Sequence, residues 1–284
     1  MSSLYEKIIN SDSYKSYLKG EIKFYDLSSN LNIEYDKLRY VFSKHKIKTR
    51  ETFLQETIQH DYFDIIDTES KAYLLGFFYA DGSITKNNHI SLSLTEEDIE
   101  IINLFKKEIC PEYKITFIRS YTNKKTGYVS KPMASITFKS KHMCETLLNY
   151  GIYNRKTYNN LISLDFIPQD MLIHFIRGYW DGDGCSCITQ VTKKHITKDG
   201  ILKKYSYLNY NWNVISFTDK HLLILKEFLN KNYNINSNII KTKKGHFLLE
   251  INKKNDYFMM RNVLYENANF YLTRKKEKYM TIPC

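Results

Sequence analysis

Two segments of the chain end in the same way, with a small residue followed by aspartate and glycine. Residues 72–82 read AYLLGFFYADG and residues 174–184 read HFIRGYWDGDG, so that Asp81 aligns with Asp183. Carboxylate oxygens are hard ligands that suit Mg²⁺, and paired metal ions can hold the attacking and leaving oxygens of a phosphodiester. The matched aspartates therefore predict metal-dependent cleavage of a phosphodiester.

The spacing of small residues predicts how the two segments meet. Gly76 and Ala80 are four residues apart, as are Gly178 and Gly182, so each pair lies on one face if the segments are helices. Small side chains let two helix backbones approach closely. We therefore expect a helix interface at these four residues.

Such a crossing would bring the two acids together. Asp81 and Asp183 would lie side by side at the C-terminal ends of the helices, where the helix dipoles add further negative charge. This arrangement needs a cation, and we expect a divalent one. Gly82 and Gly184 are expected to end the helices with a positive φ.

The elements that follow each segment occur in the same order. After the first segment, apolar spacing predicts strands at 90–98, 114–121 and 133–139, and helices at 99–109 and 142–150. After the second, it predicts strands at 185–192, 214–220, 237–243 and 247–252, and helices at 222–229 and 256–267. The fold class predicted is α+β: two pseudo-symmetric αββαββα halves, 66–165 and 166–284, that form a saddle of two sheets.

Residues 1–65 belong to neither repeat. Apolar stripes predict helices at 21–30 and 34–44 with a turn at Asn32, which is a helix–turn–helix pattern. A helical hairpin that only caps the main domain has the same pattern and stays open. Basic residues, among them Lys37 and Arg39, favour an extension that binds DNA.

Composition indicates a polyanionic partner. The chain has 284 residues, of which 43% are hydrophobic, and a formal net charge of +11, which favours nucleic acid. It contains no run of 18 apolar residues, so we expect no membrane span. Its five cysteines are odd in number and lack CxxC spacing, so we expect neither a disulfide framework nor a zinc site. An intracellular location with DNA fits best.

Both segments resemble the LAGLIDADG motif, as LLGFFYADG at 74–82 and IRGYWDGDG at 176–184. The chain is similar to the two-motif, monomeric LAGLIDADG homing endonucleases. The resemblance implies double-strand breaks in a long asymmetric DNA site. It implies two or more Mg²⁺ ions, replaceable by Mn²⁺, held by Asp81 and Asp183 with the carbonyls of Ala80 and Gly182. It also implies a basic residue near each scissile phosphate, and the matching positions are Lys156 and Lys275.

The second motif differs from the first in having Asp181 where the first has Tyr79. We expect Asp181 to form hydrogen bonds rather than to bind metal. Strand and loop residues should contact the DNA, since a two-stranded ribbon fits the major groove. The candidates, with the two from the extension, are Lys86, Asn88, Arg119, Lys139, Gln190, Lys193, Lys204, Lys241, Lys243, Lys37 and Arg39.

Two other functions fit the same sequence features. An RNA-binding maturase would place an intron RNA on the same basic saddle, and nothing in the sequence excludes it. A DNA-binding regulator would keep the fold without cleavage, and the presence of both Asp81 and Asp183 disfavours it.

Overall fold

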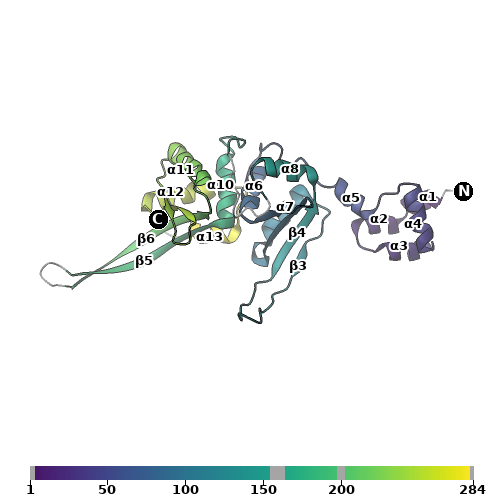
Figure 1. Cartoon of the computed structure of the whole chain (residues 1–284), viewed down its shortest axis with the longest axis horizontal. Helices are drawn as coiled ribbons and strands as arrows, with labels where there is room; N and C mark the ends of the chain where they lie inside the picture. The colour runs from purple at the N-terminus through teal and green to yellow at the C-terminus, as the bar shows by residue number, and fades with distance from the viewer. Residues whose placement is uncertain (1–3, 154–163, 197–201, 282–284) are drawn as a thin grey trace.

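The computed structural model describes residues 4–153, 164–196 and 202–281 (Figure 1). The described residues form two separate hydrophobic cores. The smaller core runs from Ile8 to Ile47, within the N-terminal helices. The larger core begins at Ile58 and also contains Phe63 and Ile66. The division between the cores therefore lies ahead of the predicted boundary at residue 65. The repeats could not reveal this, because residues 58–66 pack into the first half without being part of the repeated pattern.

The N-terminal unit is a cluster of short helices. They are α1 (Leu4–Ile9), α2 (Asp12–Lys19), α3 (Phe24–Leu31), α4 (Tyr35–Lys44) and α5 (Arg50–Glu56). Asn32 ends α3 in the left-handed conformation with a φ of 51°, so the predicted helix–turn–helix pair is present as α3 and α4. Leu27, Leu38 and Phe42 are buried between the helices. The sequence prediction did not include α1, α2 or α5.

Two halves of the same αββαββα order follow, as predicted. The first consists of α6 (Glu69–Asp81), β1 (Gly82–Ile84), β2 (His89–Thr95), the short turn η1 (Glu96–Asp98), α7 (Ile99–Ile109), β3 (Thr116–Ile118), β4 (Met133–Lys139) and α8 (Lys141–Asn149). The second consists of α10 (Leu172–Asp183), β5 (Gly184–Ile196), β6 (Leu202–Ser216), α11 (Lys220–Tyr233), β7 (Asn238–Lys241), β8 (Phe247–Ile251) and α12 (Lys254–Tyr265), with α13 (Thr273–Met280) added at the end.

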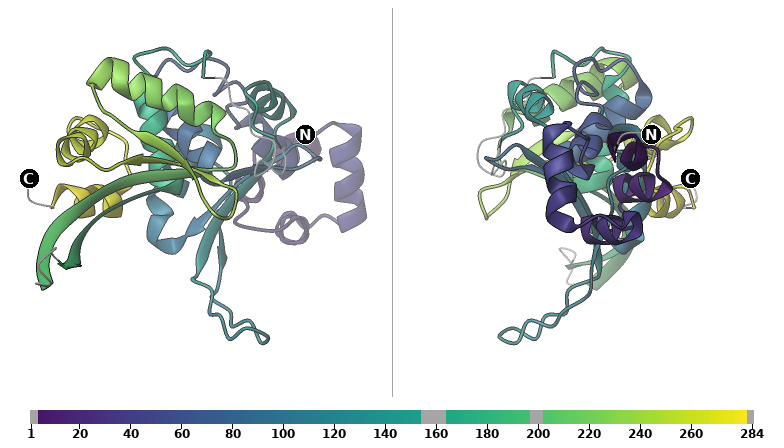
Figure 2. Two further views of the ribbon diagram at one scale, coloured as in Figure 1. Left: turned by 60° about the vertical axis from the view of Figure 1, so that its left-hand side comes forward. Right: turned by 90° about the vertical axis from the view of Figure 1, so that its right-hand side faces the viewer.

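The two sheets have matching topology. Their strand orders are β1-β2-β4-β3 and β5-β6-β8-β7, and every pairing is antiparallel. Alternate residues such as Ile90, Leu92 and Leu94 are buried in the core, whereas the residues between them are partly exposed. Helices lie along the buried faces, and the other faces curve away beneath them (Figure 2). We call the face of each sheet that these helices do not cover its open face.

One hairpin is much longer than the sequence predicts. Strands β5 and β6 pair from Gly184 and Val214 to Ile196 and Leu202, and their far part projects from the body as a two-stranded ribbon (Figure 1). The prediction recognised β6 only from Val214 onward. Residues 202–208 of β6 are exposed on both faces of the strand, so no apolar alternation marks this part of it.

The glycines after the motif helices do not have the predicted positive φ. Gly82 has a φ of −70° and Gly184 a φ of −82°, both with extended backbone. A Cβ at Gly82 would lie 2.2 Å from the ring of Phe78, and one at Gly184 would lie 2.1 Å from Trp180. Glycine is needed at both positions because an aromatic ring packs directly on the backbone. In the described part of the chain, no helix is long and apolar enough to cross a membrane.

Candidate active site

Helices α6 and α10 contact each other through their backbones. A Cβ built on Gly76 would lie 2.0 Å from the carbonyl oxygen of Phe175, and one on Gly178 would lie 2.0 Å from that of Tyr73. No side chain can occupy so short a distance, so glycine is required on both helices. The pseudo-symmetric halves therefore meet at these two glycines.

The same crossing brings the acidic ends of the helices together. A Cβ on Gly182 would lie 2.2 Å from Cβ of Ala80 and 3.0 Å from Oδ2 of Asp81. The carboxylate of Asp81 thus lies against the last turn of α10, which ends at Asp183. Both aspartates are exposed, so a ligand in solution can reach them.

Lys275 binds the C-terminal end of α10. Its Nζ donates to the carbonyl oxygens of Gly184 at 2.7 Å, Trp180 at 2.9 Å and Gly182 at 3.3 Å. Burial lowers the pKa of Lys275, and the negative charge of Asp181 acts in the opposite direction. The ammonium group supplies positive charge where the dipole of α10 is negative.

These contacts bear on two of the predicted site residues. Lys275 lies at the predicted end of the helix pair, but its ammonium group already binds three carbonyls. The carbonyl of Gly182, which is predicted to help bind metal, accepts a hydrogen bond from that ammonium group. The contact of Lys275 with a scissile phosphate stays a prediction. Lys156, its predicted counterpart in the first half, lies outside the described residues.

Asp181 is the centre of a buried hydrogen-bond network. It accepts hydrogen bonds from the hydroxyl of Tyr265 at 2.6 Å, the backbone N–H of Leu272 at 2.8 Å and the hydroxyl of Tyr73 at 2.9 Å. Burial raises the pKa of Asp181, and these donors oppose the shift. Asp181 therefore holds the chain segment before α13 against both motif helices, in agreement with the expected hydrogen-bonding role.

The matching position in the first motif, Tyr79, contacts a buried histidine instead. The hydroxyls of Tyr79 and Tyr179 lie 3.5 and 3.3 Å from Nε2 of His221, at the start of α11. Burial lowers the pKa of His221 to about 4, so the imidazole is neutral at pH 7. The two motif helices and α11 are thus joined by uncharged polar contacts.

The first turn of α13 also binds the first half. Thr273 donates to Glu100 from its backbone N–H at 2.7 Å and from its hydroxyl at 2.5 Å. Arg274 donates to both carboxylate oxygens of Asp98, at 2.5 and 2.8 Å. Together with Lys275, these residues join the first half to the end of α10. The sequence prediction did not include α13, because its eight residues, TRKKEKYM, resemble an exposed charged run.

The open faces of the sheets carry hydroxyl and amide groups. Ser91 and Thr137 hydrogen-bond across the first sheet at 2.9 Å, and Ser93 and Ser135 do so at 2.7 Å. The second sheet presents Asn209, Asn211 and Asn213 on alternate positions of β6. Side chains of these types read base edges. The N-x-N-x-N spacing is the signal in the sequence that could have revealed them.

The predicted DNA-binding residues lie on both faces of the sheets, in the loops at strand ends and on α4. Each of them is exposed except Asn88, which is partly buried in the turn between β1 and β2. By register, Lys139 and Lys193 share the open faces, whereas Gln190, Lys204 and Lys241 project to the opposite side of their strands. Residues Lys86, Arg119 and Lys243 lie in the loops at strand ends, and Lys37 and Arg39 lie on the outer surface of α4.

The residues present fit a magnesium ion. Among the described residues, no cluster of three or more His, Cys, Asp or Glu side chains could hold a metal. Mg²⁺ does not need such a cluster, because it keeps several waters and is bound by one or two carboxylates together with substrate phosphates. Asp81 and Asp183 would supply the two carboxylates.

Comparison with known proteins gives few sequence matches. No family model matches the chain. An uncharacterized protein of Methanocaldococcus jannaschii is 29% identical over 162 residues, which is 54% of each protein. The chain therefore spans about half the length of the curated relative it matches.

Solved structures similar to the chain have low sequence identity. The homing endonuclease I-WcaI, bound to its DNA recognition sequence, is 16% identical, with 79% of this chain and 92% of that chain covered and a TM-score of 0.48. Full-length DUF199/WhiA from Thermatoga maritima is 18% identical, with 79% and 66% covered and a TM-score of 0.42. The N-terminal LAGLIDADG domain of DUF199/WhiA is 17% identical, with 72% and 89% covered and a TM-score of 0.40.

The repeated sheet order and the crossing of two motif helices are features of the chain's own structure. They are the architecture that the two motifs predict, with one acid at the end of each helix. The chain therefore has the LAGLIDADG fold, built from two αββαββα halves that meet at Gly76 and Gly178.

Proposed function

We propose that the chain is a site-specific, Mg²⁺-dependent DNA endonuclease that cleaves both strands of a long asymmetric site. One observation carries the proposal: the backbone crossing of α6 and α10 places the exposed carboxylate of Asp81 against the turn that ends in Asp183. Two carboxylates at two helix C-termini are unfavourable together without a cation. Their exposure makes the site accessible to a DNA phosphate.

In this proposal each aspartate takes part in the cleavage of one DNA strand. Mg²⁺, when bound, stabilises the negative charge that develops on the phosphate and lowers the pKa of a coordinated water. Asp81 and Asp183 would hold the ion, and Mn²⁺ is expected to replace it. Lys275 fixes the end of α10 through three carbonyls, so that Asp183 keeps its position.

The rest of the surface would position the DNA. The hydroxyl and amide groups of the open faces are the candidates for reading bases, and the basic loops would contact phosphates. A net charge of +11 supports phosphate binding, so affinity should fall steeply with salt as counterions are released. The helix–turn–helix of α3 and α4 would extend this contact through Lys37 and Arg39.

A DNA-binding regulator without cleavage is the second candidate. The bound ammonium group of Lys275 favours it, because a cation of the protein itself already offsets the charge at the end of α10. An RNA target stays open, since the same surfaces suit either nucleic acid.

A cleavage selection on a randomised DNA pool tests these alternatives. We expect the wild-type chain to release one family of cut sequences in Mg²⁺ and none in EDTA. Asp81→Asn and Asp183→Asn should abolish double-strand cleavage while affinity for the selected site is retained. Binding without cleavage by the wild type would support the regulator, and cutting by the double variant would refute the proposed mechanism.

A further inference from the structure

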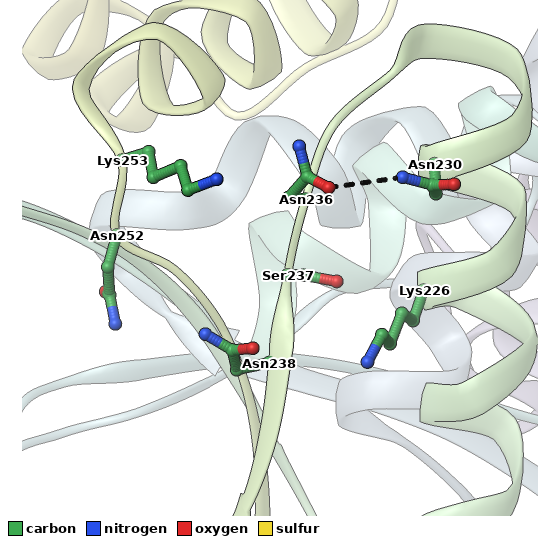
Figure 3. A pocket seen from close by; sticks show the side chains of 7 residues that line it. All are labelled: Lys226, Asn230, Asn236, Ser237, Asn238, Asn252 and Lys253. Carbon is green, nitrogen blue, oxygen red and sulfur yellow. Dashed lines mark hydrogen bonds between the residues drawn. The ribbon is translucent and has the colours of Figure 1, made fainter.

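The second half contains a polar cavity that the cleavage proposal does not use. It has a volume of about 340 Å³ and lies between α11, the chain entering β7 and the turn from β8 to α12 (Figure 3). Two lysines, four asparagines and one serine line it. Among these lining residues there is no carboxylate and no apolar side chain, so the cavity suits a polar ligand.

Ser237 is the buried part of this lining. Only 6% of its surface is exposed, and its Oγ has no hydrogen-bond partner among the described residues. A buried hydroxyl without a partner costs about 1–3 kcal/mol, and such groups in native proteins indicate a bound water, ion or ligand. The hydroxyl can donate to an anion in the cavity.

Two ammonium groups provide the charge. Lys226 extends from α11 toward Asn238, and Lys253 extends from the turn before α12 toward Asn236 (Figure 3). Two carboxylates border the cavity: Asp256 accepts from the backbone N–H of the lining residue Asn236 at 3.3 Å, and Glu250 accepts from the side-chain amide of the lining residue Asn252 at 3.2 Å. In both hydrogen bonds the donor belongs to an asparagine, so neither uses an ammonium group and each lysine can donate to a ligand.

We propose that this cavity binds a phosphate group, held by the ammonium groups of Lys226 and Lys253 and by the hydroxyl of Ser237. Charge-assisted hydrogen bonds to phosphate oxygens are stronger than neutral ones. The phosphate can belong to a nucleic-acid backbone or to a free phosphorylated molecule, since the chemistry is the same. The site does not depend on the proposed cleavage, because none of its residues lies near Asp81 or Asp183 in the sequence or at the helix crossing.

Inorganic phosphate is the direct probe. We expect equilibrium dialysis of the full chain with radiolabelled phosphate, against chloride of matched ionic strength, to show one bound phosphate. Lys226→Met combined with Lys253→Met should weaken binding at least about tenfold, since two charged hydrogen bonds are lost. Lys220→Met combined with Lys231→Met removes the same charge from helix α11 outside the cavity; it is the matched control and should bind like the wild type.

Ser237→Ala separates binding from folding. It should lower phosphate affinity by a few-fold without lowering the melting temperature, because the hydroxyl it removes has no partner in the part of the chain that the structure describes. Failure of the wild type to bind phosphate above the chloride background would overturn the proposal and leave a water-filled cavity. Equal loss in the control that lacks Lys220 and Lys231 would also overturn it, since binding would then depend only on net charge.

Competition between DNA and bound phosphate identifies the source of the phosphate. If the duplex from the cleavage selection displaces the bound phosphate, the site belongs to the DNA-binding surface. If phosphate remains bound to the DNA complex, its ligand is a free phosphorylated molecule. Both results retain the site, and the dialysis itself contains no DNA, so its outcome is independent of whether the chain cleaves.

Discussion

Replacing Gly178 with alanine tests the crossing of the motif helices. The added Cβ would lie 2.0 Å from the carbonyl oxygen of Tyr73 and 2.8 Å from the backbone nitrogen of Phe77. Carbon–oxygen contacts of this type normally begin at about 3.3 Å, so the helices would have to separate by about 1.3 Å. Overpacking usually costs 1–3 kcal/mol, and here the opposing atoms are backbone atoms that cannot rotate away. We therefore expect a loss of at least about 3 kcal/mol in the free energy of unfolding.

Urea unfolding of the purified variant measures this loss. Gly127→Ala is the matched control, because among the described residues no atom beyond its chain neighbours would lie within 4 Å of the added Cβ, and its φ is +69°. The control should lose only about 1–2 kcal/mol, the cost of placing alanine in the left-handed region. The separation of the helices should also reduce cleavage, since Asp81 is held against α10. If Gly178→Ala were no less stable than the control, the close backbone crossing would be refuted.

Three further predictions concern the elements around the site. The pKa of His221 is lowered from 6.5 to about 4 by burial, so between these pH values the unfolded chain binds a proton that the folded chain does not. Stability should therefore fall by about 3 kcal/mol as the pH decreases from 6.5 to 4, and His221→Gln should remove most of that dependence in urea titrations. Arg274→Gln and Asp98→Asn should show a coupling energy of about 1 kcal/mol in a double-mutant cycle, because the ion pair is bidentate but its arginine is half exposed. If the two effects on stability were additive, this contact would not join the halves. Removing residues 1–49 should leave the melting temperature of the larger core unchanged, because the two cores are separate. The same deletion should weaken DNA binding, and an unchanged affinity would show that the extension is only structural.

The helix crossing could be predicted from sequence because its cause is local. A pair of small residues at helical spacing occurs twice, and only glycine fits a backbone contact of the kind seen at Gly76 and Gly178. The helix–turn–helix pair was also predictable, since Leu27, Leu38 and Phe42 form apolar stripes around a turn at Asn32. Both features depend on periodicity within short segments.

The role of α13 could not be predicted in the same way. Arg274 and Lys275 are charged residues in a polar run, and their partners Asp98 and the carbonyls of α10 are far away in sequence. The far part of β6 was missed because both of its faces are exposed, which removes the alternation that marks a strand. Long-range polar contacts and an unsupported ribbon leave no periodic pattern in the sequence.

Chemical cross-linking tests the juxtaposition of the two acids most directly. Asp81→Cys and Asp183→Cys would be combined in a chain in which the accessible cysteines Cys185 and Cys187, and the C-terminal Cys284, are changed to serine. A short thiol cross-linker should join the two introduced cysteines rapidly within a single folded chain, and proteolysis should show one link between the halves. If the two positions cross-link no faster than in the urea-unfolded chain, the acids do not share a site and the account is wrong.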